Sequence, residues 1–319
     1  MLTDQIVARR PLGSAGGSGS TLERVTLDDG RELVCKRVSP EWDWISRATN
    51  DRGRALSMWS SGLFERFPPA IDHATVAVES DGAGWTVFMR DVSDALVPDD
   101  RRLDRASVQR VLAAMAELHL AFWGDSFPEL CGLEDRYLLL SPRTAKREQD
   151  NWVGQTISRC WDAFSELVPT DIASAVLTLA DRPALLAEQL ERCEQTLIHG
   201  DIRLSNLGFH DDRLVVIDWG DRTGAAPAAV ELASFLAFDA RRLDVSRDDV
   251  IADSRALYGD RFDETALQLA FIGGMVQLGC HFVLDLVLHG GDEARESATT
   301  ELAWWTTKVS AAFETWSPV

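Results

Sequence analysis

Two residues that could share a metal ion, Asn206 and Asp218, flank a short apolar segment. Residues 207–209 and 214–217 have the composition of two short strands, and the polar residues 210–213 between them predict a hairpin turn. Both residues are six positions from residue 212, so the hairpin would place them opposite each other. Opposed side chains lie about 5 Å apart, and carboxylate and amide oxygens suit Mg²⁺. The spacing therefore predicts a magnesium site at the open end of the hairpin.

A third residue, Asp201, lies five positions before Asn206, close enough on the same loop to serve a reacting hydroxyl beside that metal ion. Phosphoryl transfer needs little covalent help from a protein. It needs the phosphates held, their charge neutralised by metal, and an acceptor oxygen oriented in line. Two metal ligands and a base supply the last two requirements, so the three residues predict phosphoryl transfer with Mg²⁺.

The order of these residues resembles that of the aminoglycoside phosphotransferase and choline kinase superfamily, relatives of protein kinases that phosphorylate small molecules. Two motifs carry the resemblance: His199-Gly200-Asp201 with Asn206 after four further residues, and Ile217-Asp218-Trp219-Gly220. The resemblance implies that Asp201 is the catalytic base or orients the hydroxyl, and that Arg203 steadies the transferred phosphoryl group. It assigns Asn206 and Asp218 to the nucleotide-bound Mg²⁺.

The same resemblance implies an ATP site between two lobes. Lys36 lies in the strand-like run 33–38, and a lysine there reaches the α- and β-phosphates. The Gly- and Ser-rich stretch 13–20, which contains Ser18, could fold over the phosphates with its backbone N–H groups. A flexible linker is the ordinary alternative for such a composition. Met89 lies where the hinge would meet the adenine, although core packing explains a methionine there equally well.

Two positions depart from the family pattern. A kinase-like lysine usually pairs with a Glu on the following helix, but the matching stretch has Arg52 in that place. Asp51 and Glu41 are alternative partners. Where relatives have Asp-Leu-Ala after the metal loop, this chain has Glu231 at the first position. We expect Glu231, together with His199, to brace the catalytic loop.

Apolar periodicity divides the chain into a strand-rich first part and a helix-rich second part. Strands are expected at residues 21–27, 31–38, 75–78 and 85–89, with a helix near 46–60. After a polar connection at 91–104, helices are expected at 108–122, from about 144 to 195, and again after residue 218. The sequence therefore predicts an α+β, bilobal protein-kinase-like fold. Residues 1–92 would form a small β-rich nucleotide-binding lobe, and residues 93–319 a larger helical lobe with the catalytic loop and acceptor site.

Composition narrows the function classes further. The formal net charge of −19 argues against a nucleic-acid partner and against docking on an anionic membrane, because both need a basic surface. The apolar run 270–288 contains Gln277, His281 and Asp285, which favours a buried helix over a membrane span. Five scattered cysteines favour reduced thiols, and the first residues lack a signal-peptide pattern. A cytoplasmic protein is expected, and its oligomeric state stays open.

The predicted function is ATP-dependent transfer of the γ-phosphoryl group to a hydroxyl of a small molecule. Amino sugars, aminoglycosides and choline-like compounds are the candidate acceptors. Asp221, Asp285 and Glu301 are available to bind amines, and Trp152 could face a sugar or a quaternary amine. The alternative is a catalytically degenerate kinase-like protein that binds nucleotide without turnover, which the missing Glu would suit.

Overall fold

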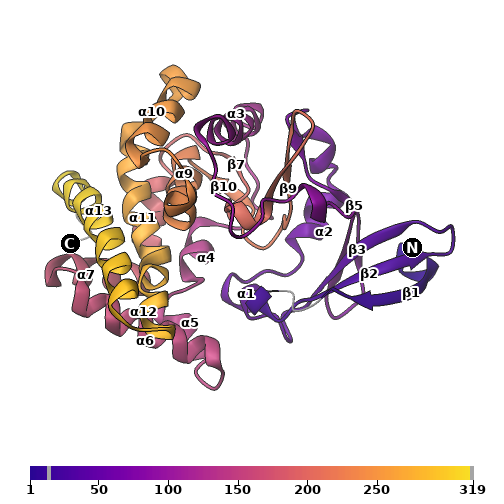
Figure 1. The fold of residues 1–319 in the computed structure, drawn as a ribbon, viewed down its shortest axis with the longest axis horizontal. Helices are drawn as coiled ribbons and strands as arrows, with labels where there is room; N and C mark the ends of the chain where they lie inside the picture. The colour runs from indigo at the N-terminus through magenta and orange to yellow at the C-terminus, as the bar shows by residue number, and fades with distance from the viewer. Residues whose placement is uncertain (13–15, 317–319) are drawn as a thin grey trace.

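The N-terminal part is a five-stranded antiparallel sheet in the order β1-β2-β3-β6-β5 (Figure 1). The computed structural model describes residues 1–12 and 16–316. The strands span Ile6–Pro11 (β1), Thr21–Leu27 (β2), Glu32–Val38 (β3), Thr75–Ser80 (β5) and Trp85–Met89 (β6). The predictions of β2, β3, β5 and β6 are confirmed. Strand β1 was missed because it is an edge strand with mostly exposed residues, and so lacks an alternating apolar pattern.

Alternation along β3 places Lys36 on the sheet face that is turned toward the rest of the protein. Val34, Lys36 and Val38 pair in register with Met89, Val87 and Trp85 of β6. The apolar members of this set form one buried cluster. The lysine is therefore surrounded by β-branched and aromatic side chains, which hold its aliphatic stem and leave the ammonium group to find a polar partner.

The single helix predicted near residues 46–60 is wrong: the structure has two short helices, α1 (Trp44–Ala48) and α2 (Arg54–Ser60). Between them the backbone turns sharply, with φ of 53° at Asn50 and 115° at Gly53. Asp51 accepts hydrogen bonds from the backbone N–H groups of Gly53 and Arg54, each at 2.8 Å. This carboxylate satisfies backbone donors at the start of α2. A new helix therefore begins here instead of α1 continuing.

The chain from α2 to β4 (Ile71–Asp72) packs against the helical part of the protein. Met58, Phe64 and Ile71 belong to the large core cluster that the helices build. Strand β4 also pairs in parallel with β9 (Arg213–Val216), which follows the catalytic loop. The division into lobes at residue 92 stays a prediction. Residues before position 92 nevertheless pack into the core of the helical part.

The helical part surrounds one buried helix, α11 (Glu264–Phe282), which contacts α4, α6, α7, α8, α9 and α13. Its neighbours and the remaining helices span Arg105–Ala121 (α3), Leu133–Leu138 (α4), Pro142–Arg147 (α5), Trp152–Leu167 (α6), Thr170–Asp181 (α7), Ala184–Leu190 (α8), Ala228–Asp239 (α9), Arg247–Tyr258 (α10), Leu284–Leu288 (α12) and Asp292–Thr315 (α13). Within the described residues, Glu264–Leu288 alone has the length and hydropathy of a membrane span, and 67% of its apolar window is buried inside the protein. The predicted buried helix is confirmed for residues 270–282, but the run breaks at Val283, and α12 has no buried residue.

Two small sheets lie beneath the catalytic residues. Strand β7 (Thr196–Ile198) pairs with β10 (Gly224–Ala226), and β8 (Leu207–His210) forms a hairpin with β9. The hairpin turn holds two residues, Asp211 and Asp212, because His210 pairs with Arg213. This turn is shorter than the predicted 210–213 turn, but both turns are centred between residues 211 and 212. The observed register differs by one residue from the predicted one because the prediction counted from residue 212. The α+β class predicted from the sequence is confirmed.

Candidate active site

A cavity of about 560 Å³ lies between the N-terminal sheet and the helical part. Of the seven residues that the sequence assigned to the site, six line this cavity: Ser18, Lys36, Met89, Arg203, Asn206 and Asp218. The seventh, Asp201, is only 2% exposed and contacts Asn206. The structure therefore brings all seven to one place, although their separation along the chain reaches almost two hundred residues.

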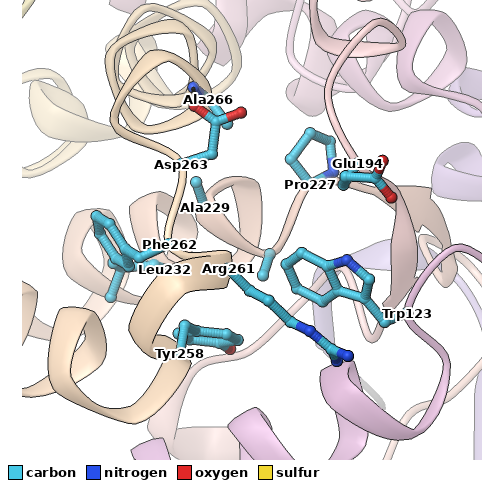
Figure 2. A pocket seen from close by; sticks show the side chains of 11 residues that line it. Trp123, Glu194, Pro227, Ala229, Leu232, Tyr258, Arg261, Phe262, Asp263 and Ala266 are labelled. Atoms are coloured by element: carbon cyan, nitrogen blue, oxygen red, sulfur yellow. Dashed lines mark hydrogen bonds between the residues drawn. The ribbon is translucent and has the colours of Figure 1, made fainter.

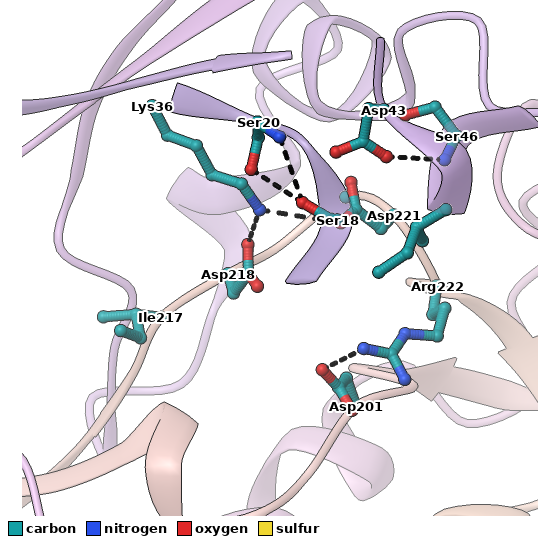
Figure 3. A network of polar contacts seen from close by, with 12 residues as sticks. Ser18, Ser20, Lys36, Asp43, Ser46, Asp201, Ile217, Asp218, Asp221 and Arg222 are labelled. Atoms are coloured by element: carbon teal, nitrogen blue, oxygen red, sulfur yellow. Dashed lines mark hydrogen bonds and ion pairs between the residues drawn. The ribbon is translucent and has the colours of Figure 1, made fainter. Parts of the chain in front are cut away.

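Asp201 is held by three neighbouring side chains, and one of its oxygens is left over. The Asn206 amide nitrogen donates to Asp201 Oδ2 and to its backbone oxygen, both at 3.0 Å. Arg222 also donates to Oδ2, as Figure 3 shows. Arg203 Nε lies 3.4 Å from the same atom. Oδ1 has no hydrogen-bond partner among the described residues. The carboxylate is thus fixed by one oxygen, and the other is available to accept a proton or a hydrogen bond.

The backbone just before Asp201 is fixed by the buried carboxylate of Glu231, on α9. It accepts hydrogen bonds from the N–H groups of His199 at 3.0 Å and Gly200 at 2.6 Å. His119 Nε2 lies 3.0 Å from the same carboxylate, and His119 Nδ1 meets the Tyr258 hydroxyl at 2.5 Å. Burial raises the pKa of Glu231, but these contacts outweigh it and the net shift is downward. The bracing contact expected of Glu231 is present.

His199 joins the catalytic loop to the strand that leads into Asp218. Its Nδ1 accepts from the backbone N–H of Asp201 at 3.1 Å, and its Nε2 meets the backbone oxygen of Ile217 at 3.0 Å. Burial lowers the pKa of this imidazole, which favours the neutral form that such a pair of bonds needs. The side chain links two backbones, which agrees with the bracing role expected from the sequence.

The predicted opposition of Asn206 and Asp218 is wrong by one residue. Ile217, not Asp218, is bonded across from Asn206, and its N–H donates to the Asn206 backbone oxygen at 3.0 Å. Strict strand alternation would then turn Asp218 to the opposite face. Asp218 instead has a φ of 69°, in the left-handed region, and this breaks the alternation. As a result, Asn206 and Asp218 line the same cavity after all.

Lys36 is paired with two carboxylates of the loop that follows β9. Its ammonium group forms an ion pair with Asp218 and lies 3.6 Å from Asp221 Oδ2, as Figure 3 shows. Neither alternative partner named from the sequence is in place. Asp51 caps α2, and Glu41 is exposed. The acidic partners of the lysine therefore come from the metal loop and not from the helix after β3.

The two carboxylates beside Lys36 have opposite electrostatic tendencies. Burial raises the pKa of Asp218, but the charge and hydrogen bond of Lys36 outweigh it and bring this pKa down to about 2. Burial raises the pKa of Asp221 to about 7, and Lys36 offsets only part of that effect. Burial lowers the pKa of Lys36, but the two carboxylates reverse the shift and keep the ammonium charged.

The described part of the Gly- and Ser-rich stretch lies along the cavity as a short 3₁₀ turn, Gly16–Ser18, followed by Ser20. Ser18 and Ser20 join their hydroxyls at 2.8 Å, and Trp44 Nε1 donates to the Gly17 backbone oxygen at 2.6 Å. A Cβ on Gly19 would lie 2.3 Å from the Trp42 backbone oxygen. These contacts hold residues 16–20 close to α1, and residues 13–15 of the predicted stretch lie outside the described residues.

The sequence did not indicate that Arg222 belongs to the site or that Asp221 lies beside Lys36. Asp221 was considered only as an amine ligand, but it approaches Lys36. Arg222, the residue after Asp221, is buried and pairs with the Asp201 carboxylate. The spacing Asp-x-x-Asp at 218–221 was a usable signal for a second acid. Nothing in the sequence around Arg222 indicated burial.

A second hollow lies on the other side of α9 and is too small for a nucleotide. Trp123, Tyr258 and Arg261 surround it together with residues that follow α8 and α10 (Figure 2). Its volume is about 30 Å³, room for about one water molecule. This hollow is therefore no alternative to the cavity beside Lys36 as a nucleotide site.

The sequence matches the phosphotransferase enzyme family over residues 14–268, which include the catalytic loop, the metal loop and Lys36. The chain therefore belongs to this family, and the resemblance stated from the motifs is confirmed. No curated protein matches the sequence significantly.

Solved structures with the same fold include several small-molecule kinases. One is a fructosamine-3-kinase assigned as such in Thermobifida fusca, with TM-score 0.51, 19% identity, and 98% of this chain and 96% of that chain covered. Another is a choline kinase from Streptococcus pneumoniae, with TM-score 0.54, 10% identity, and coverage of 96% and 94%. A third is a spectinomycin phosphotransferase in complex with AMP, with TM-score 0.52, 15% identity, and coverage of 98% and 94%. The predicted kinase-like fold is confirmed.

The Glu231 contacts lead to a stability prediction. Replacing Glu231 by Gln puts an NH₂ group in place of one acceptor oxygen and leaves a buried backbone N–H without its partner. We expect the free energy of unfolding to fall by about 1–3 kcal/mol. Denaturant unfolding measures this change, with Glu117→Gln on the exposed face of α3 as the matched control.

The loss should depend on pH with a definite sign. Because the folded pKa of Glu231 is lowered, its ionised form stabilises the fold above the unfolded pKa, and that contribution disappears as pH falls through the folded pKa. The difference between wild type and Glu231→Gln should therefore be large at about pH 7 and shrink below about pH 4. An equal difference at both pH values would contradict the role of the charge.

The partners of Lys36 lead to a second prediction. We expect Asp221→Asn to weaken nucleotide binding about tenfold, because Lys36 loses one of the two carboxyl groups that position it. Glu41→Gln is the matched control and should leave affinity unchanged. Titration calorimetry with ADP and Mg²⁺ measures both. A larger effect from Glu41→Gln would show that Glu41, and not Asp221, is the acidic partner that positions Lys36.

Proposed function

We propose that the chain is an ATP-dependent kinase of small-molecule alcohols. The observation that carries this proposal is the meeting of Lys36, Asn206 and Asp218 at one cavity, with Asp201 fixed directly against Asn206. Membership of the phosphotransferase enzyme family supports the reaction class. The AMP complex of the spectinomycin phosphotransferase, which has the same fold, supports an adenine nucleotide.

The nucleotide would lie beneath the N-terminal sheet. Lys36 is the charged group that can meet the α- and β-phosphates, and it is already fixed by two carboxylates. The turn at Ser18 offers backbone N–H groups beside the same cavity. Met89, at the end of β6 and 8% exposed, borders the cavity where an apolar base would be received. These three positions support the assignments made from the sequence.

The residues present fit a Mg²⁺ ion. Asn206 uses its amide nitrogen on Asp201, so its amide oxygen is the atom left for a ligand. Asp218 is kept ionised by Lys36, and a deprotonated carboxylate is what a metal site requires. When bound with the nucleotide, Mg²⁺ neutralises phosphate charge and orients the phosphoryl group. Asn206 and Asp218 would hold it.

The reaction would use Asp201 as the group that receives the proton. The acceptor oxygen forms a bond to the γ-phosphorus, and the bond from that phosphorus to the oxygen bridging to the β-phosphate breaks, which releases ADP. The hydroxyl proton passes to Asp201 Oδ1, the oxygen without a partner among the described residues. Arg203 lies beside the same carboxylate and borders the cavity, where its charge can meet the transferred group.

The proposed compartment is the cytoplasm, and the proposed partner is a small molecule. The described cysteines are free, which suits a reducing, cytoplasmic compartment. The strongly negative net charge supports a partner other than nucleic acid or an anionic membrane.

A degenerate kinase that only binds nucleotide is the second candidate, because the Glu after β3 is missing. Asp221 lies beside Lys36 where that Glu would be expected to pair, so the missing Glu no longer argues for a degenerate kinase. The geometry therefore favours the enzyme.

The proposed base leads to a third prediction. Asp201→Asn should lower kcat about a hundredfold or more, while nucleotide affinity stays close to wild type, because the amide cannot accept the proton. Phosphoryl transfer from labelled ATP to an acceptor panel measures kcat, and calorimetry measures nucleotide affinity. Asp212→Asn, in the exposed hairpin turn, is the matched control. Equal losses in turnover and nucleotide affinity would assign Asp201 another role.

A further inference from the structure

The side of the cavity away from Lys36 is built from apolar side chains of four helices. Ile157 and Cys160 come from α6, Phe238 comes from α9, Cys280 comes from α11, and Leu284 comes from α12. Ile157, Cys160 and the neighbouring Cys280 of α11 are buried. This wall faces the space that the proposed function leaves for the acceptor, because Lys36, Ser18 and Met89 occupy the nucleotide side.

Carboxylates are absent from this wall in the part of the chain that the structure describes. The acids that border the cavity are Asp218 and Asp221, and both are engaged by Lys36. Two acids that could have served an amine are elsewhere. Glu301 is buried and paired with Arg247, and Asp285 does not border the cavity.

The charged or ionisable groups on the acceptor side are basic. The Arg203 guanidinium lies over the Phe238 ring, 5.7 Å from its centroid. The His281 ring also packs against Phe238, with 5.2 Å between the two ring centroids. Burial, with help from Arg241 and Arg203, lowers the pKa of His281 to about 4, so this ring is neutral at physiological pH. Arg222 also borders the cavity. A cation entering here would meet apolar carbon and two guanidinium groups that are already paired with Asp201.

From this lining we propose that the acceptor is an electrically neutral, mainly apolar alcohol, and not a polyamine sugar or a quaternary ammonium alcohol. The inference rests on the proposed function and names its substrate class. Moving an ammonium group from water into a wall without a carboxylate costs free energy that nothing in this wall returns. An aliphatic or aromatic ring gains free energy there, in proportion to the apolar area it buries.

The negative surface of the protein does not alter this conclusion. A net charge of −19 attracts cations to the molecule as a whole, but long-range attraction is screened by salt and raises encounter rates more than it selects a bound ligand. Selection depends on the groups in contact with the ligand. On the acceptor side these are apolar or basic, apart from Asp201 at the reacting hydroxyl.

Matched pairs of alcohols test the inference directly. The first pair is choline and its carbon isostere, in which a quaternary carbon replaces the quaternary nitrogen. The second is cyclohexanol with a para ammonium group and cyclohexanol with a para methyl group. Kanamycin is the polycationic probe. Binding of each is measured by calorimetry with the full chain saturated with ADP and Mg²⁺.

We expect the neutral member of each pair to bind at least about tenfold more tightly than the cationic member, and kanamycin to bind more weakly than either neutral alcohol. A cationic member that binds as tightly as its neutral isostere would overturn the inference, and so would failure of both neutral alcohols to bind. The nucleotide titration separates this from the proposed function. Absence of ADP binding defeats the proposed function, whereas ADP binding with a preference for cations defeats the inference alone.

A variant with an added charge supplies the second test. Thr156 borders the cavity from α6 and is half-buried, so Thr156→Glu places a carboxylate on the acceptor wall. We expect the preference within each pair to move toward the cation by about tenfold. Ser158→Glu, on an exposed position of the same helix, is the control and should leave the preference unchanged. An unchanged preference in folded Thr156→Glu, or an equal change in Ser158→Glu, would show that the charge of the wall does not select the acceptor.

Discussion

A half-buried ammonium group paired with two carboxylates connects the two halves of the site. Lys36 comes from the middle of the N-terminal sheet, and Asp218 and Asp221 come from the loop after β9. Attraction between partly buried charges is stronger than between charges in water. This attraction opposes movement of the sheet away from that loop and so favours the present form of the cavity between them. The position of every group on the nucleotide side depends on this link.

The catalytic side is stabilised by a different set of contacts, which all reach the backbone. Glu231 accepts from two successive N–H groups before Asp201, and His199 joins the same loop to the strand before Asp218. Because these bonds fix main-chain atoms, the side chains of Asp201 and Asn206 are free to meet each other and a substrate. The left-handed backbone at Asp218 completes the arrangement, since it turns this carboxylate to the face that Asn206 already occupies. Strain at one residue is accepted where it serves the site.

The sequence could predict the chemistry better than its exact geometry. Residue types and spacing at 199–206 and 217–220 identified the catalytic side, and alternation along β3 identified the face of Lys36. The predicted opposition of Asn206 and Asp218 was wrong because it took residue 212 as the centre of the turn, whereas the centre lies between residues 211 and 212. The helix near residue 50 was wrong because Asp51 competes for backbone donors at the start of α2. The partners of Lys36 were missed because they lie about 180 residues away, and no local pattern reports such a contact.

The central claim is that Asn206 and Asp218 hold Mg²⁺ while Lys36 meets the phosphates and Asp221 keeps it in place. The most direct measurement is a crystal structure of the chain with Mg²⁺ and a non-hydrolysable ATP analogue. The account requires the cation to be ligated by the Asn206 amide oxygen and the Asp218 carboxylate, with Lys36 beside the α- and β-phosphates and still close to Asp221. A cation bound without these two residues, or phosphates held away from Lys36, would contradict it.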